Sequence, residues 1–174
     1  MLAEARQAAS EAGVSIEWIK VDATQFTASR QYDAAICLCE GAFSLLSMDD
    51  DPIEHDLAIL RNIHAALKPG GGLILTAVNG MRHIRRYTDE DVTNGLFDPV
   101  TLTETCTMDW DTPDGKQERL VRERGYVPTE LCLLFQMVGF EVIHVGGGTA
   151  GKWGHRVPQL DEIELLAIGK KPDS

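Results

Sequence analysis

The 174-residue sequence is poor in basic residues and has no long apolar run. It carries 16 lysines and arginines against 27 aspartates and glutamates, a net charge of −11. Such a surface repels phosphate backbones and anionic lipids, which argues against nucleic acid and membranes as partners. No apolar stretch approaches the roughly 20 residues that cross a bilayer. The first six residues also lack the basic start and apolar stretch of a signal peptide.

Cysteine and histidine occur without the spacing that metal sites need. The four cysteines are Cys37, Cys39, Cys106 and Cys132. They form no CxxC pair, and the histidines at 55, 64, 83, 144 and 155 complete no zinc-binding spacing, so no metal is expected. We expect buried free thiols and a cytoplasmic protein, because a reducing compartment keeps thiols unpaired.

The order of apolar segments predicts one α/β domain over residues 1–174. Helical spacing, an Asp51-Pro52 start and glycine stops predict three helices, at residues 1–12, 52–67 and 130–138. Apolar runs predict five strands, at 16–21, 34–39, 73–78, 140–145 and 162–168. Alternation of this kind builds a three-layer sheet. The last strand follows another strand directly, so we expect it to enter antiparallel.

Residues 80–126 break the alternation and form a polar insert on the substrate side of the domain. Two alternating runs lie near Thr101–Trp110 and Gln117–Tyr126, with Asp114-Gly115 between them. An Asp-Gly pair between alternating runs is a hairpin signal. The pattern therefore predicts an antiparallel hairpin at the edge of the sheet or over the carboxyl ends of its strands.

Four segments in order resemble class I S-adenosylmethionine-dependent methyltransferases. The most specific is Leu67-Lys68-Pro69-Gly70-Gly71-Gly72-Leu73, close to the family's LKPGGxL segment. The others are the opening helix from Met1, Val21-Asp22-Ala23, and the strand run Tyr32–Leu38. The resemblance implies a Rossmann-like methyltransferase sheet, S-adenosylmethionine as the cofactor and a small-molecule acceptor. A flavodoxin-like alternative fits the glycine segment and the antiparallel last strand less well.

The family's glycine-rich cofactor loop and the acid that binds the ribose are not found in this sequence. Gly146-Gly147-Gly148 is no substitute, because it lies late in the chain and does not lead into a helix. We therefore expect a methyltransferase sheet truncated by its first two strands, with Met1 as an internal methionine of a longer frame. Its activity would be impaired. The alternative is a non-catalytic remnant that acts as an oligomerising or regulatory subunit.

The resemblance also assigns cofactor contacts, which are Asp22, Ala23, Cys39, Glu40, Gly41 and Phe43. Asp22 would accept a hydrogen bond from the adenine amino group, or else only cap the turn after its strand. Cys39, Glu40 and Gly41 end a parallel strand, where open α/β sheets bind ligands. Phe43 would line the adenine pocket or pack in the core.

Catalytic and acceptor-binding residues carry a weaker signal, because methyl transfer depends mainly on positioning. Glu40 and Tyr126 are the candidates for a catalytic group, although a solvated loop acid explains Glu40 equally well. The acceptor-binding candidates are Arg86, Tyr87, Trp110, Arg122 and Tyr126. Arg82, Arg85 and Arg86 can bind a carboxylate or phosphate, or form a solvated face paired with Asp89, Glu90 and Asp91. Trp110, Arg122 and Tyr126 can instead stabilise the hairpin by cross-strand pairing.

The family's strand order implies a further consequence of the absent strands. Strand 16–21 and strand 34–39 would be separated by two vacant positions, so an apolar central strand would become an open edge. Exposed edges recruit other strands. The first strand can slide across, a second copy can pair, or another polypeptide can complete the sheet; of these we expect a homodimer.

Overall fold

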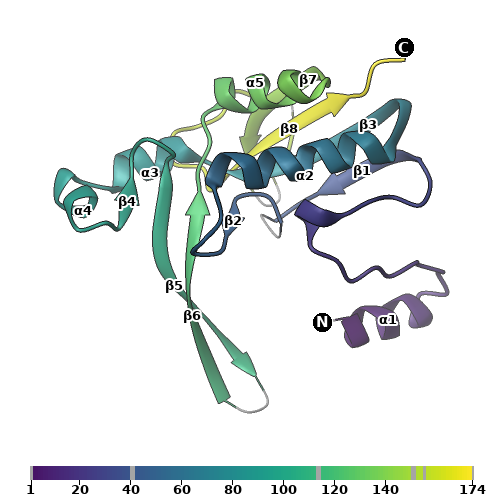
Figure 1. Ribbon diagram of the computed structural model, residues 1–174, viewed down its shortest axis with the longest axis horizontal. Coiled ribbons are helices and arrows are strands. Elements are labelled where there is room, and N and C mark those ends of the chain that lie inside the picture. The colour runs from purple at the N-terminus through teal and green to yellow at the C-terminus, as the bar shows by residue number, and fades with distance from the viewer. Residues whose placement is uncertain (1, 40–41, 113–114, 150–151, 155, 174) are drawn as a thin grey trace.

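The protein is an α/β fold with two four-stranded sheets that meet at the end of one long strand (Figure 1). The computed structural model describes residues 2–39, 42–112, 115–149, 152–154 and 156–173. No helix within these ranges is long and apolar enough to cross a membrane.

The first sheet carries the sequence signature of the fold. Its strands are ordered β1 (Tyr32–Cys37), β3 (Leu67–Val78), β8 (Glu164–Lys170) and β7 (Glu141–Gly148). β1 and β3 are neighbours and run parallel, with Ala35 opposite Leu73. β8 is antiparallel to both β3 and β7, which confirms the expected direction of the last strand.

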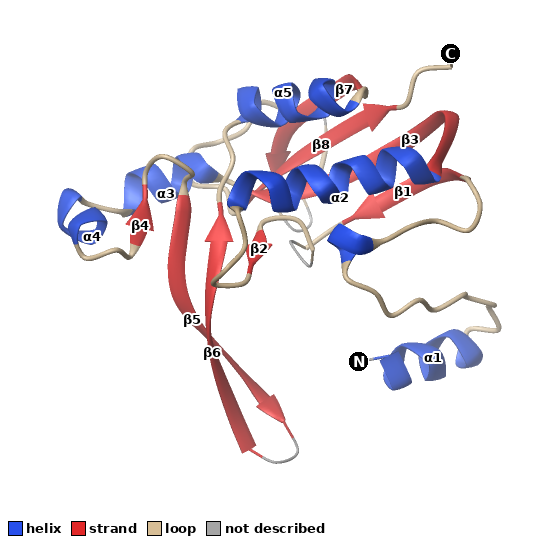
Figure 2. Cartoon of the chain, in the orientation of Figure 1, coloured by secondary structure: helices blue, strands red, loops and turns tan. Residues whose placement is uncertain are grey.

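Two helices, α2 (Pro52–Ala66) and α5 (Pro128–Val138), cover one face of this sheet (Figure 2). The Asp51 carboxylate accepts hydrogen bonds from two amides in the first turn of α2, as its cap pattern predicts. α5 begins after Val127, which offers no side-chain cap, and ends at Gly139 in the left-handed conformation. Leu73 and Leu75 of β3 point into the core beneath these helices.

The opposite face of the first sheet keeps apolar side chains in solvent. Ile36 of β1 is 71% exposed and Ile74 of β3 is 41% exposed. Successive residues of a strand alternate between faces, so the helix-covered side and this side draw on alternate residues of the same strands. β1 also forms the edge of the sheet, as expected for an apolar strand without a second neighbour.

The second sheet is larger than the expected hairpin. β5 (Thr103–Thr112) and β6 (Gly115–Arg124) pair antiparallel and confirm the hairpin, although Asp114 of the turn lies outside the described residues. Two-residue strands β2 (Leu45–Leu46) and β4 (Phe97–Asp98) flank it, and the short helices α3 (Gly80–Arg86) and α4 (Asp89–Thr93) precede it. The Tyr126 amide donates to the Val78 carbonyl, so this sheet is anchored at the carboxyl end of β3.

The prediction of a strand at residues 16–21 is wrong, because this segment has no regular secondary structure. It connects α1 (Leu2–Glu11), which lies apart from the sheets in Figure 1, to the short 3-10 turn at Ala23–Gln25. Alternating apolar residues form a strand only when a neighbour supplies hydrogen bonds. No described strand pairs with this segment.

Candidate functional site

The carboxyl end of β1 has the geometry of a ligand-binding edge. Cys39 follows the strand with a φ of 59°, in the left-handed backbone conformation that residues other than glycine seldom adopt. Its amide donates to the Thr76 hydroxyl of β3 over 2.9 Å, which ties the turn to the neighbouring strand. Cys39 is exposed, so the expectation that this thiol is buried is wrong. Glu40 and Gly41 lie outside the described residues.

A cavity of about 490 Å³ adjoins Cys39 on the face without helices. Its described walls are mostly apolar, with the Thr76 hydroxyl, the Cys39 thiol and the Trp153 indole as polar groups; they comprise Leu38, Cys39, Ile74, Thr76, Trp153, Leu166 and Ile168. This volume lies within the range of small-molecule sites, which are mostly apolar with a few polar groups that fix orientation. The cavity therefore accepts a flat apolar group better than a charged one.

The remaining residues expected around the cofactor take structural positions. Asp22 is exposed and accepts hydrogen bonds from the hydroxyl and the amide of Thr24. These two hydrogen bonds, the hydroxyl first, lower the pKa of Asp22. The Ala23 carbonyl accepts a hydrogen bond from Asn62 of α2. Phe43 is fully buried and stacks on Tyr126 with ring centroids 5.1 Å apart. Thus Asp22 caps its turn and Phe43 belongs to the core.

Tyr126, a candidate for both catalysis and acceptor binding, is also fully buried. Its hydroxyl donates to Asp56 and accepts from Arg124 over 3.1 Å. Arg124 in turn pairs with Glu130 at 2.5 Å. Burial, followed by the Asp56 charge, raises the pKa of Tyr126 well above its usual range. The hydroxyl is therefore held protonated inside a structural network.

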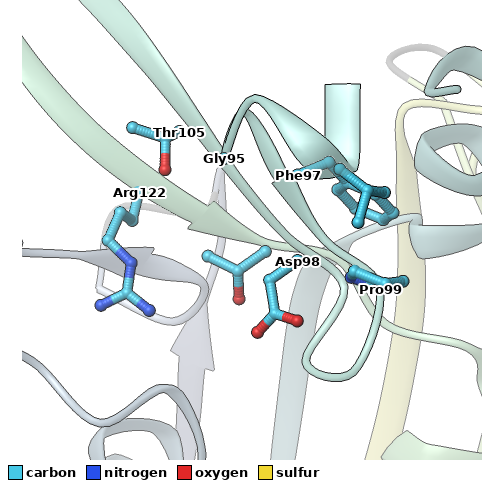
Figure 3. Close-up of a pocket in the computed structure, with 8 residues that line it drawn as sticks. Gly95, Phe97, Asp98, Pro99, Thr105 and Arg122 are labelled. Atoms are coloured by element: carbon cyan, nitrogen blue, oxygen red, sulfur yellow. The ribbon is translucent and has the colours of Figure 1, made fainter. Parts of the chain in front are cut away.

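Arg122 lies in a second cavity, of about 240 Å³, between α4 and the second sheet (Figure 3). The walls also include Phe97, Asp98 and Thr105. Arg122 donates to the backbone carbonyls of Met48 and Asp50, at 3.3 and 2.9 Å. These bonds hold the guanidinium beside the cavity while part of its donor set stays unused by them.

The basic cluster of α3 pairs differently from the solvated face weighed above. Arg85 contacts Asp161 at 3.1 Å and Arg86 contacts Glu104 at 3.7 Å. Asp91 is engaged instead in a capping box with Thr88 at the start of α4. Tyr87 also hydrogen-bonds to Glu104; burial, and then this bond, raise the pKa of Tyr87. Arg86 and Tyr87 therefore converge on one carboxylate.

The five acceptor-binding candidates do not come together in one site. Arg86 and Tyr87 meet at Glu104, Arg122 borders the smaller cavity, and Tyr126 is in the core. Trp110 stands near the far end of the hairpin and is 45% exposed. The sequence pattern also missed a group formed by His83, Glu104 and Glu123. Only the register of β5 on β6 and the position of α3 bring these three together.

The fold is similar to that of solved S-adenosylmethionine-dependent methyltransferase structures. Searches of family models and of curated proteins match nothing. Solved structures do match. The methyltransferase CcbJ from Streptomyces caelestis aligns with 98% of this chain and 75% of its own, at a TM-score of 0.69 and 15% identity.

Two further structures show the same similarity. An S-adenosylmethionine-dependent methyltransferase from Clostridium acetobutylicum matches at a TM-score of 0.67 and 11% identity, over 98% of this chain and 71% of that one. The 1,6-didemethyltoxoflavin-N1-methyltransferase of Burkholderia thailandensis, solved with S-adenosylhomocysteine, matches at a TM-score of 0.52 and 16% identity. There the alignment covers 98% of this chain but 57% of its counterpart.

Proposed function

We propose that this chain is an S-adenosylmethionine-dependent methyltransferase that acts on a small molecule. The observation that carries the proposal is the α/β fold with the sheet order β1-β3-β8-β7, which aligns with solved methyltransferase structures over 98% of the chain. The carboxyl ends of parallel strands are where such sheets bind ligands. Cys39 and its neighbouring cavity occupy that edge.

The residues at this edge fit the adenosine part of the cofactor. The Leu38, Ile74 and Trp153 side chains offer apolar and aromatic walls for a purine, and the Thr76 hydroxyl offers a polar contact. Among the described residues, the lining has no charged side chain for the carboxylate and ammonium of the methionine part. We therefore expect weak cofactor binding at this edge.

The chemistry asks for positioning more than for a reactive side chain. The cofactor's sulfonium supplies an activated methyl group, and the protein must hold an acceptor in line with it. We place the acceptor against the 80–126 region, with Arg122 beside the smaller cavity; Arg86 and Tyr87 meet at Glu104, outside the lining of that cavity. The buried Tyr126 hydroxyl is left to a structural role.

Calorimetric titration with S-adenosylhomocysteine tests the proposal. We expect micromolar or weaker binding that Ile74→Arg abolishes, because the new side chain would fill the larger cavity. Ile53→Arg is the matched control, since Ile53 is 45% exposed on α2, outside the lining of that cavity. Absence of heat at millimolar ligand, or equal loss in both variants, would contradict cofactor binding at this edge.

A second candidate function is that of an oligomerising subunit without catalysis. The observation that favours it is apolar exposure at the β1 edge and before it: Ile36 is 71% exposed, Ile16 47% and Ile19 49%. Exposed apolar edges recruit further strands. We propose a homodimer through β1, with residues 14–21 completing the contact. Sedimentation should show a dimer that Ile36→Lys dissociates, whereas a compact micromolar monomer would exclude it.

A further inference from the structure

A buried cluster of one imidazole and two carboxylates lies where α3 packs on the second sheet. The cluster comprises His83 of α3, Glu104 of β5 and Glu123 of β6. One ligand atom from each residue lies within 4.8 Å of the other two. The three residues come from three different elements, so the tertiary fold alone assembles the cluster.

The two carboxylates face each other, and Arg82 and Arg86 are the cations near the pair. Glu104 and Glu123 are direct cross-strand partners, and like charges placed opposite each other destabilise a sheet. The Glu104 side chain is 7% exposed, and Arg86, its one close cation among the described residues, is itself 60% exposed. In the same described ranges no ion pair within 4 Å reaches Glu123. Burial first, and then the charge of Glu104, raise the pKa of Glu123.

His83 is oriented as metal-binding histidines commonly are. Its side chain is 3% exposed. Nδ1 lies 3.4 Å from the Leu102 carbonyl, which can accept the Nδ1 proton, and Nε2 is the ring nitrogen that faces Glu104. Nε2 lies 3.9 Å from Oε2 of Glu104, too far for a hydrogen bond. Two electron-rich atoms thus face each other.

We propose that His83, Glu104 and Glu123 bind one divalent transition-metal ion, with zinc as the best match. One imidazole nitrogen and two carboxylate oxygens form a three-ligand set that leaves a position open for water or a ligand. Ligand atoms around tetrahedral zinc lie roughly 3.4 Å apart, so a modest inward movement from the observed separations suffices. The Tyr87 hydroxyl, bonded to Glu104, supplies the outer support that metal ligands usually have.

The proposed metal site is independent of methyl transfer. A bound ion would also fix the position of α3 relative to the hairpin. A bound ion would join α3 to both strands of the hairpin, across residues 83, 104 and 123. Any ligand bound at its open position would lie within the 80–126 region, next to α3 and the hairpin. The shared chemistry of such a ligand is an anionic oxygen or a neutral nitrogen donor.

Metal content and calorimetry on the full chain test the site. The chain is first stripped of metal with a chelator and then titrated with zinc, and we expect it to take up one zinc ion per chain. Glu123→Gln, which keeps the shape of the half-buried side chain, should lower the zinc affinity at least tenfold. Glu118→Gln is the matched control, because Glu118 is an exposed residue of the same strand. Unchanged zinc affinity in Glu123→Gln, or no uptake by the unaltered chain, would overturn the proposal.

Cobalt substitution separates this site from the cysteines. We expect visible d–d absorption without thiolate-to-cobalt charge transfer, because the proposed ligands are nitrogen and oxygen alone. A charge-transfer band would assign the ion to a cysteine and refute the proposal. His83→Ala is a further variant, and circular dichroism checks that it folds. If His83→Ala does not fold, the result for Glu123→Gln is the one that tests the proposal.

Discussion

The hydroxyl of Tyr126 donates a hydrogen bond to the carboxylate of Asp56, joining residues 70 positions apart in the chain. Asp56 is fully buried in α2 and also accepts from the Ser44 amide over 3.2 Å. Arg124 adds a hydrogen bond to the Tyr126 hydroxyl and another to the Pro52 carbonyl. This network connects α2 to the segment that links the second sheet to α5.

Replacement of Tyr126 by phenylalanine should destabilise the protein by about 1–3 kcal/mol, because it leaves a buried carboxylate short of a donor. Urea unfolding measures the change. Tyr32→Phe is the control, since Tyr32 lies on the open edge strand and its hydroxyl faces the exposed Arg30. Equal losses in the two variants would show that the Asp56 contact contributes little.

His55 should make stability depend on pH. Its Nδ1 lies 2.7 Å from Oδ1 of Asp56, and this hydrogen bond, aided by the Asp56 charge, raises the pKa of His55 despite partial burial. The folded pKa lies above the unfolded value of about 6.5, so protonated His55 stabilises the fold, and this contribution is complete below the unfolded pKa. The contribution then disappears as pH rises through the folded pKa. The effect of His55→Gln on urea unfolding should therefore be larger at acidic than at alkaline pH.

His64 supplies the opposite case for that experiment. Burial, followed by the charge of Lys171, lowers the pKa of His64. A depressed histidine pKa favours folding above the unfolded pKa and loses this contribution as pH falls. The penalty for His64→Gln should therefore shrink toward acidic pH. Parallel trends in the two histidine variants would contradict both assignments.

Gly139 should tolerate no side chain without a cost. It ends α5 with a φ of 98°, a conformation that costs other residues about 1–2 kcal/mol. Gly139→Ala is therefore expected to lower the free energy of unfolding by that amount. Gly72→Ala is the control, because an added Cβ there would meet only the Gly169 carbonyl oxygen, at 4.0 Å. A larger loss at Gly72 would refute the conformational explanation.

The Asp51 cap should contribute measurably to α2. Its Oδ1 accepts hydrogen bonds from the Ile53 and Glu54 amides, both at 2.9 Å. Asp51→Ala should cost about 0.5–2 kcal/mol, as for other helix N-caps. Asp49→Ala removes the same charge from a nearby exposed position and serves as the control. Thermal unfolding of both variants distinguishes loss of the cap from loss of negative charge.

Local patterns predicted the elements that local forces control. The Asp51-Pro52 start, the Gly139 stop and the alternating runs around Gly115 all gave the observed helices and hairpin. Residues 16–21 are also rich in apolar side chains and still form no strand. The difference lies in the partner: a hairpin brings its own neighbouring strand, whereas 16–21 depends on one that the described chain does not place beside it.

The candidate site was predictable only where strand ends define it. Cys39 follows the carboxyl end of β1, as the strand pattern indicated, and lines a cavity there, but Phe43 and Tyr126 turned inward to stack in the core. An aromatic residue suits a pocket wall and a core equally well, so its type does not decide between them. The smaller cavity beside Arg122 depends on the short strand β4. Two residues are too few to show the alternation of apolar and polar side chains that predicts a strand.

The amino-acid sequence by itself determined the nature of the elements, because helix caps, turn glycines and apolar periods act over a few neighbouring residues. The tertiary structure alone decided which distant groups meet. Glu104 faces Glu123 because of the register of β5 on β6, and His83 reaches them because α3 leaves β3 at Asn79 and folds over that sheet. Such contacts arise from packing between elements, which no local pattern encodes.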